Sequence, residues 1–175
     1  MDEIEIVDYN PNWANMFERE AEAIRGVVKK DLIVEIQHIG STAVPGLAAK
    51  PVIDIMIGLR DLSDGKKIIQ PLKELGYVYW ADNPDDKKMF FVKGMPPYGE
   101  KRTHHVHMVE IDGEFWQRRL FRDYLRINPQ EASRYEKLKR DLAVRFRDDR
   151  EAYTEGKSDY VAEVMEKARR EFQNN

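Results

Sequence analysis

Residues able to bind a metal ion are concentrated in a short run near the middle of the sequence. The run Thr103-His-His-Val-His107 holds three of the chain's four histidines. If it forms a strand, His105 and His107 point to one face and His104 points to the other. Two imidazoles on one face can share one cation or one phosphate, although such a pair also occurs on sheet surfaces that bind nothing.

Asp54 is the second residue that suggests chemistry, because it is a carboxylate between two isoleucines in an apolar run. Burying an unpaired carboxylate is costly, so we expect Asp54 to meet a metal ion, a histidine or an arginine. The simpler alternative is that it caps a loop or pairs with Lys50 or an arginine. If neighbouring strands bring His38 to the same place, then Asp54, His38, His105 and His107 form one predicted metal site.

The segment Gly40-Ser-Thr42 directly follows a predicted strand and ends it. A glycine–serine turn at this point directs backbone N–H groups and a hydroxyl toward one spot, which suits a phosphate oxygen. Lys50 follows in the same loop and either reaches that phosphate or is simply solvated. The sequence therefore predicts an anion site around Gly40 and Ser41.

Arginines form a further pattern in the C-terminal third. Arg118, Arg122 and Arg126 are spaced four residues apart, so they line one face of a predicted helix. Such a face can bind a phosphate or a carboxylate-rich ligand. It can equally be a solvated face paired with Asp123 and other acids.

A mixed sheet flanked by helices is expected to position these residues. Apolar and β-branched runs predict strands at residues 32–39, 52–59, 77–80, 88–93 and 103–111, with a short strand or arm at 4–7. Apolar residues at helical spacing predict helices at residues 10–28 and 62–75, and from residue 114 onward. The expected fold is α/β (α+β), a single domain over residues 1–175 with a helical C-terminal third.

Composition limits the classes of partner. The 175 residues are 42% apolar and carry a net charge of -3, so no overall positive field favours nucleic acid or anionic lipid. Cysteine is absent, which excludes disulfides and thiolate metal sites and fits a cytoplasmic protein. No apolar run is long enough to cross a bilayer, and the acidic N-terminus is unlike a signal peptide.

The sequence resembles the GrpB family, a set of bacterial and archaeal proteins related to the nucleotidyltransferase superfamily. The resemblance is most specific in the block from His38 to Asp54. It also includes Tyr9-Asn-Pro-Asn-Trp13, Gly76-Tyr77, His105-Val-His107, Phe121-Arg-Asp-Tyr-Leu-Arg126, Tyr135, Leu138-Lys139, Tyr153 and Lys157. It implies a nucleotidyltransferase-like mixed sheet. Because family members also occur fused to dephospho-CoA kinase, it suggests by association a role in nucleotide or coenzyme metabolism.

The resemblance also implies an active site. Gly40 and Ser41 would hold nucleotide phosphates, and Asp54 would be the first of the acids that bind two Mg²⁺ ions. In that pattern a second acid lies two residues after the first, but here this position is Met56, which cannot bind Mg²⁺. On a later strand, where the pattern often has a third acid, this sequence has His105 and His107. Imidazoles favour a softer ion, so the predicted divalent metal is left open among Mg²⁺, Mn²⁺ and Zn²⁺.

Two functions follow as hypotheses. The first is a metal-dependent nucleotidyltransferase-like enzyme acting on a nucleotide or small phosphorylated ligand, with Asp54, Ser41 and His107 as catalytic residues. The ligand would be held by Gly40, Ser41, Thr42, Lys50, Arg122 and Lys157. The second is a non-catalytic module that binds a ligand or metal and has lost the acid pair. A metal hydrolase would need more acids than the sequence offers.

Overall fold

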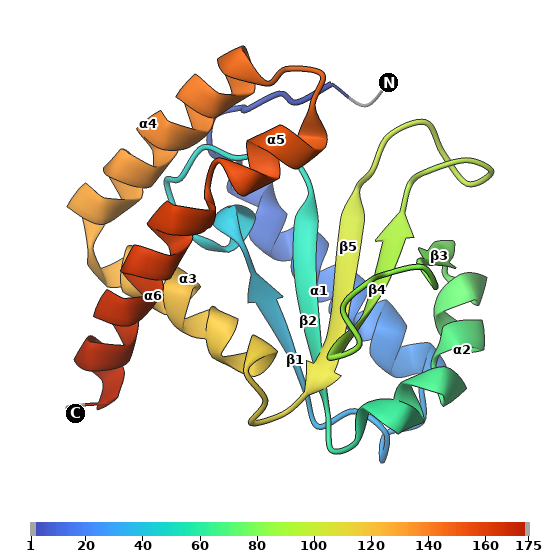
Figure 1. The fold of residues 1–175 in the computed structure, drawn as a ribbon. Coiled ribbons are helices and arrows are strands. Elements are labelled where there is room, and N and C mark those ends of the chain that lie inside the picture. Colours follow the sequence, from blue (N-terminus) through green and yellow to red (C-terminus); the bar gives the residue numbers. More distant parts are fainter. Residues whose placement is uncertain (1–2, 174–175) are drawn as a thin grey trace. The chain divides into compact units, whose positions relative to one another are not determined.

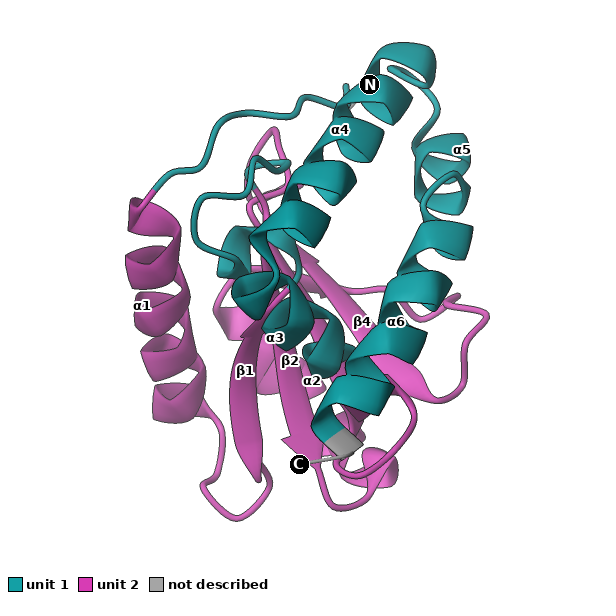
Figure 2. Cartoon of the chain, turned by 90° about the vertical axis from the view of Figure 1, so that its left-hand side faces the viewer, with its two compact units in different colours: residues 1–10, 40–51, 118–175 teal, residues 11–39, 52–117 magenta. Residues whose placement is uncertain are grey.

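The computed structural model describes residues 3–173 and divides the chain into two compact units (Figure 2). The sheet unit comprises residues 11–39 and 52–117. The helical unit comprises residues 1–10, 40–51 and 118–175. Both units are built from segments that are separated in sequence, so the chain passes between them several times. The expectation of one domain over residues 1–175 stays a prediction.

The sheet unit contains, among the described residues, one five-stranded sheet in the order β1-β2-β5-β4-β3 (Figure 1). Strands β2 and β5 are parallel, and the other neighbouring pairs are antiparallel. The strong apolar character of β2 agrees with its place inside the sheet, where six of its seven residues are buried. The mixed sheet expected from the sequence is confirmed. The strands are β1 (Glu35–Ile39), β2 (Ile53–Leu59), β3 (Tyr77–Tyr79), β4 (Lys88–Lys93) and β5 (His104–Glu110).

Two helices accompany this sheet. Helix α1 (Asn12–Val27) buries Trp13, Ala21 and Ile24, which lie at helical spacing on one face. The helix expected over residues 62–75 is divided into a 3-10 segment, η2 (Leu62–Lys67), and a short helix, α2 (Ile69–Glu74). Pro71 explains the division, because proline clashes with the preceding turn inside a helix but is tolerated in its first turn.

The helical unit contains the expected C-terminal helices, which are α3 (Arg119–Ile127), α4 (Pro129–Arg145), α5 (Arg150–Glu155) and α6 (Ser158–Gln173). Their apolar faces pack on one another, on the N-terminal arm and on the segment 40–51. One cluster joins Val44, Leu47, Leu125, Tyr135 and Val164, and another joins Ile4, Leu142, Ala143 and Tyr153. None of the helices in the described residues is long and apolar enough to cross a membrane.

Helices α3 and α4 hold the segment 40–51 through its backbone. Arg126 donates from Nε and Nη2 to the carbonyl oxygen of Ala43, at 3.0 and 2.8 Å. Glu136 accepts from the N–H of Ala48 at 3.2 Å, and Lys139 donates from Nζ to the carbonyl of the same residue. These contacts satisfy backbone groups that a segment without regular structure would otherwise leave unpaired.

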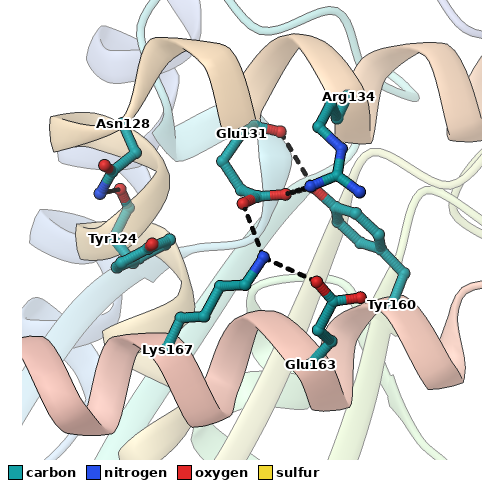
Figure 3. A network of polar contacts seen from close by, with 7 residues as sticks. All are labelled: Tyr124, Asn128, Glu131, Arg134, Tyr160, Glu163 and Lys167. Atoms are coloured by element: carbon teal, nitrogen blue, oxygen red, sulfur yellow. Dashed lines mark hydrogen bonds and ion pairs between the residues drawn. The ribbon is translucent and has the colours of Figure 1, made fainter.

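A second set of polar contacts connects α4 and α6 around the buried carboxylate of Glu131 (Figure 3). Tyr160 donates its hydroxyl to Oε1 at 2.6 Å, and Lys167 lies 3.1 Å from Oε2. Arg134 approaches Oε1 to 3.1 Å, while Lys167 also pairs with Glu163 at 2.6 Å. Although burial raises the pKa of Glu131, the bonds from Tyr160 and Lys167 outweigh this and lower it below the ordinary 4.5.

Substituting Glu131→Gln is expected to lower the free energy of unfolding by about 1–3 kcal/mol at neutral pH, because the charged acceptor is lost. The folded-state pKa lies below the ordinary value, so the carboxylate's contribution is present above pH 4.5 and is lost as the pH falls. Urea unfolding at neutral and acidic pH should therefore show the difference narrowing in acid. Glu163→Gln, half exposed at 52%, is the control and should change stability by roughly 0–1 kcal/mol.

Candidate metal centre

Asp54, His105 and His107 converge on one face of the sheet unit. In the parallel pairing of β2 and β5, Asp54 lies opposite His105 and Met56 lies opposite His107, so these side chains share a face. Asp54 Oδ1 is 3.0 Å from His105 Nδ1 and 3.5 Å from His107 Nε2. One ligand atom from each of the three residues lies within 4.8 Å of the others. The structure thus brings together three of the four predicted metal ligands.

Apolar groups border this cluster. The ring of Phe90, on β4, lies 5.1 Å from the His105 ring and 5.0 Å from the His107 ring, measured between centroids. The same face of the sheet also carries Ile39, Met56, Val109 and Trp116, which pack together. The side chains of Asp54 and His107 remain 29% and 22% exposed. These two side chains are therefore only partly buried.

The electrostatics favour a form that can bind metal. Burial would raise the pKa of Asp54, but hydrogen bonds and positive charge from His105 and His107 outweigh it and hold the pKa well below its usual range. Burial lowers the pKa of His107, and the Asp54 carboxylate opposes this shift only in part. Carboxylate and neutral imidazole are the forms that coordinate a cation.

The donor set fits a divalent first-row metal ion. The Nε2 atom of His105 is buried and has no hydrogen-bond partner among the described residues, while its Nδ1 faces Asp54. A cation could lie at that nitrogen, with Asp54 orienting the ring, or be bound directly by all three side chains. Two imidazoles and one carboxylate suit Zn²⁺ or Mn²⁺ and leave positions open, whereas Mg²⁺ prefers a set of oxygens.

His38 does not join this centre, which corrects the predicted ligand set. In the antiparallel pairing of β1 with β2, Ile39 lies opposite Asp54 and His38 lies opposite Ile55, so His38 points to the other face. Its ring is buried and stacks on Phe17 of α1, with centroids 4.8 Å apart and planes 9° apart. His38 therefore contributes to the packing of α1 on the sheet.

His104 and Glu110 complete the description of β5. His104 occupies the same face as His38, and its Nε2 lies 3.9 Å from the buried Glu20, which also pairs with Lys93 at 2.7 Å. The Oε1 atom of Glu110 accepts from the N–H of Leu62 at 3.1 Å. The carboxylate of Glu110 thus binds the backbone at the start of η2 rather than replacing the missing acid.

The predicted phosphate-binding residues all belong to the helical unit. Gly40 has φ 72°, a left-handed value that favours glycine, and Ser41 and Thr42 begin the 3-10 segment η1 (Ser41–Ala43). Thr42 is buried. The Nε of Arg122 lies 2.7 Å from Asp123 Oδ1, which is the paired arrangement considered as the alternative. Since the metal ligands belong to the sheet unit, a joint site with Ser41 stays a prediction.

Lys50 and Lys157 do come together within the helical unit. Their Nζ atoms lie 5.0 and 4.4 Å from the centroid of the Tyr153 ring. Lys139 of α4 is 2% exposed and was not predicted as a site residue. A signal for it was present, because Tyr135, Lys139 and Leu142 share the spacing of one buried helix face.

These features define a mixed α/β protein that carries a candidate metal centre on its sheet. The sequence matches the family described as GrpB protein over residues 3–167. The chain belongs to the GrpB family, as the sequence resemblance indicated.

Individual relatives agree with this assignment. A UPF0157 protein of Pseudomonas aeruginosa is 46% identical over 167 residues, which are 95% of this chain and 68% of that protein. The UPF0157 protein YqkA of Bacillus subtilis is 39% identical over 95% of this chain but only 48% of its own length. The crystal structure of the conserved protein GrpB from Enterococcus faecalis superposes with a TM-score of 0.86 at 31% identity, covering 97% and 99% of the two chains.

Proposed function

We propose that the protein binds a divalent metal ion through Asp54, His105 and His107 and uses the ion to hold a nucleotide or a small phosphorylated ligand. The observation that supports this most directly is the convergence of the three side chains, whose ligand atoms lie within 4.8 Å of one another and two of which, Asp54 and His107, are only partly buried. A cation held there would retain open positions for phosphate oxygens and would offset their negative charge.

As an enzyme, the protein would transfer a nucleotidyl group with Asp54 as metal ligand and His107 as ligand or proton acceptor. The resemblance of the sequence to the nucleotidyltransferase superfamily favours this form of the proposal. A single acid supplies less negative charge than two closely spaced Mg²⁺ ions require, so we propose a one-metal centre.

A non-catalytic binding module is the second candidate, and Met56 favours it. Met56 lies two residues after Asp54, where the nucleotidyltransferase pattern has its second acid, and it is 1% exposed within an apolar cluster. The position of a second acid is therefore filled by core packing rather than by a polar group that could regain metal binding. This candidate predicts ligand binding without turnover.

Thermal unfolding with Zn²⁺, Mn²⁺ or Mg²⁺, each alone and with a nucleoside triphosphate, tests the proposal. At a ligand concentration of about 100 times Kd the expected stabilisation is roughly 2.7 kcal/mol. For a chain of this size that corresponds to a Tm rise of roughly 5–10 °C. With the metal present, the nucleotide is expected to raise the Tm further. Without the metal, or in Asp54→Asn, it should not change the Tm.

Absence of any shift with all three ions would contradict the metal centre itself. If shifts occur, incubation with labelled nucleoside triphosphate and analysis of the products distinguishes the two candidates. Product formation that Asp54→Asn abolishes would exclude the non-catalytic module, and binding without product would support it.

A further inference from the structure

Three lysines converge in the helical unit although they lie far apart in the sequence. Lys50 is the second-last residue of the segment 40–51, Lys139 lies on α4, and Lys157 directly precedes α6. The Nζ atoms of Lys50 and Lys157 lie 5.0 and 4.4 Å from the centroid of the Tyr153 ring. Lys139 Nζ lies 4.9 Å from the centroid of the Tyr135 ring and donates to the carbonyl of Ala48.

The charges around Lys139 are mostly of its own sign. Burial is the largest cause that lowers the pKa of Lys139, and the positive charges of Lys157, Arg140 and Lys50 add to it, so that the pKa is about 7. Glu136 opposes the shift. The carboxylate of Glu136 is itself engaged by Arg140, at 3.0 Å, and by the N–H of Ala48, at 3.2 Å. Concentrating cations in a region of low dielectric costs free energy, which a bound anion would offset.

We propose that Lys50, Lys139 and Lys157 form a binding site for a multiply charged oxyanion, such as the phosphate group of a ligand. Lysine ammonium groups are compact point charges with several donors, which suits tetrahedral oxyanions. Lys50 and Lys157 are only half-buried, so an anion can approach them from solvent, whereas Lys139 forms the buried end of the site. The phosphorylated nature of the natural ligand rests on the proposed function, but the site does not use the metal centre.

A purely structural role for Lys139 makes a different prediction. In that case its ammonium group only fixes the carbonyl of Ala48 and packs on Tyr135, and an added anion would not alter its protonation. If instead an anion binds among the lysines, it stabilises the charged form of Lys139, so binding is accompanied by proton uptake slightly above neutral pH. Proton uptake is therefore the measurement that separates the two roles.

Isothermal titration calorimetry with sodium sulfate, which does not titrate near neutral pH, provides the test. The intact protein, freed of divalent ions with EDTA and then dialysed free of EDTA, is titrated slightly above neutral pH and at constant ionic strength, in two buffers with different ionisation enthalpies. We expect saturable sulfate binding with uptake of a fraction of one proton, and competition by inorganic phosphate. Because EDTA removes divalent ions, failure of the metal centre would leave this result unchanged.

Variants complete the test. Lys139→Met is expected to lower sulfate affinity about tenfold and to abolish proton uptake, because one of three charges is lost. Lys157→Gln, at a half-buried position, should lower affinity similarly and covers the case in which Lys139→Met fails to fold. Lys137→Met, on the exposed face of the same helix, should behave as the unsubstituted chain. Absence of sulfate binding, or equal affinity and proton uptake in folded Lys139→Met or Lys157→Gln, would overturn the proposal.

Discussion

An alanine in place of His107 is expected to weaken Zn²⁺ binding by at least roughly 10–100-fold, since even the loss of a residue that only supports a metal ligand has that effect. The Nε2 atom of His107 lies 3.5 Å from the carboxylate of Asp54, so its removal takes away one of the three donors. Competition with a chromophoric chelator measures the change. Substituting Asp54→Asn should weaken binding at least as much, because the only negative charge among the three donors is lost.

The matched control for His107 is His104, which lies on the same strand but on the opposite face. His104 is close to Glu20 of α1, so His104→Ala should affect the packing of that helix and leave Zn²⁺ affinity within about twofold of the parent. If His104→Ala weakened binding as much as His107→Ala did, the metal would be bound elsewhere or the effect would be general unfolding. Circular dichroism and urea unfolding of each variant identify the second case.

The strands that carry the centre could be predicted from local sequence because their signals are local. The expected strands at residues 52–59 and 103–111 correspond to β2 (Ile53–Leu59) and β5 (His104–Glu110). The alternation of side chains along β5 was enough to separate His104 from His105 and His107. Placing Asp54 beside them required that the two strands be neighbours and that their register align Asp54 with His105, and the structure has both.

The error at His38 has a different origin, because it depends on the register between two strands. A shift of one residue would have placed His38 opposite Asp54, and the sequence contains no turn of defined length to fix the pairing of β1 with β2. The observed register places Ile39 there instead. Register is decided by burial of whole faces, and the packing of His38 against Phe17 is part of that tertiary outcome.

The division of the chain was also beyond the sequence analysis. Composition changes little at residues 40 and 51, yet the segment between them belongs with the C-terminal helices. Its assignment depends on contacts from Arg126 and Glu136 to its backbone, and these side chains are more than eighty residues away in sequence. Lys139 makes a contact of the same kind, since its Nζ donates to the carbonyl of Ala48, and the helical spacing that indicates its burial does not show that contact.

Substituting Gly94→Ala is expected to have the largest effect on stability, a loss of about 2–5 kcal/mol in the free energy of unfolding. Gly94 follows β4 with φ 94°, a left-handed conformation that disfavours any side chain. An added Cβ would also lie 2.2 Å from the carbonyl oxygen of Lys101 and 3.0 Å from the N–H nitrogen of Thr103. Both are near the start of β5, so the strand that carries His105 and His107 must shift.

Gly76→Ala separates the conformational cost of a side chain in a left-handed position from the cost of the steric clash at Gly94. Gly76 has a similar φ of 87°, but the nearest atom to an added Cβ is 3.9 Å away, an ordinary van der Waals contact. Its substitution should therefore cost only the conformational penalty, about 1–2 kcal/mol. Urea unfolding of both variants measures the difference, which reports the steric clash at Gly94. Because that clash displaces the beginning of β5, only Gly94→Ala should also weaken Zn²⁺ binding. Equal losses of unfolding free energy in the two variants would show that β5 absorbs the added methyl without moving.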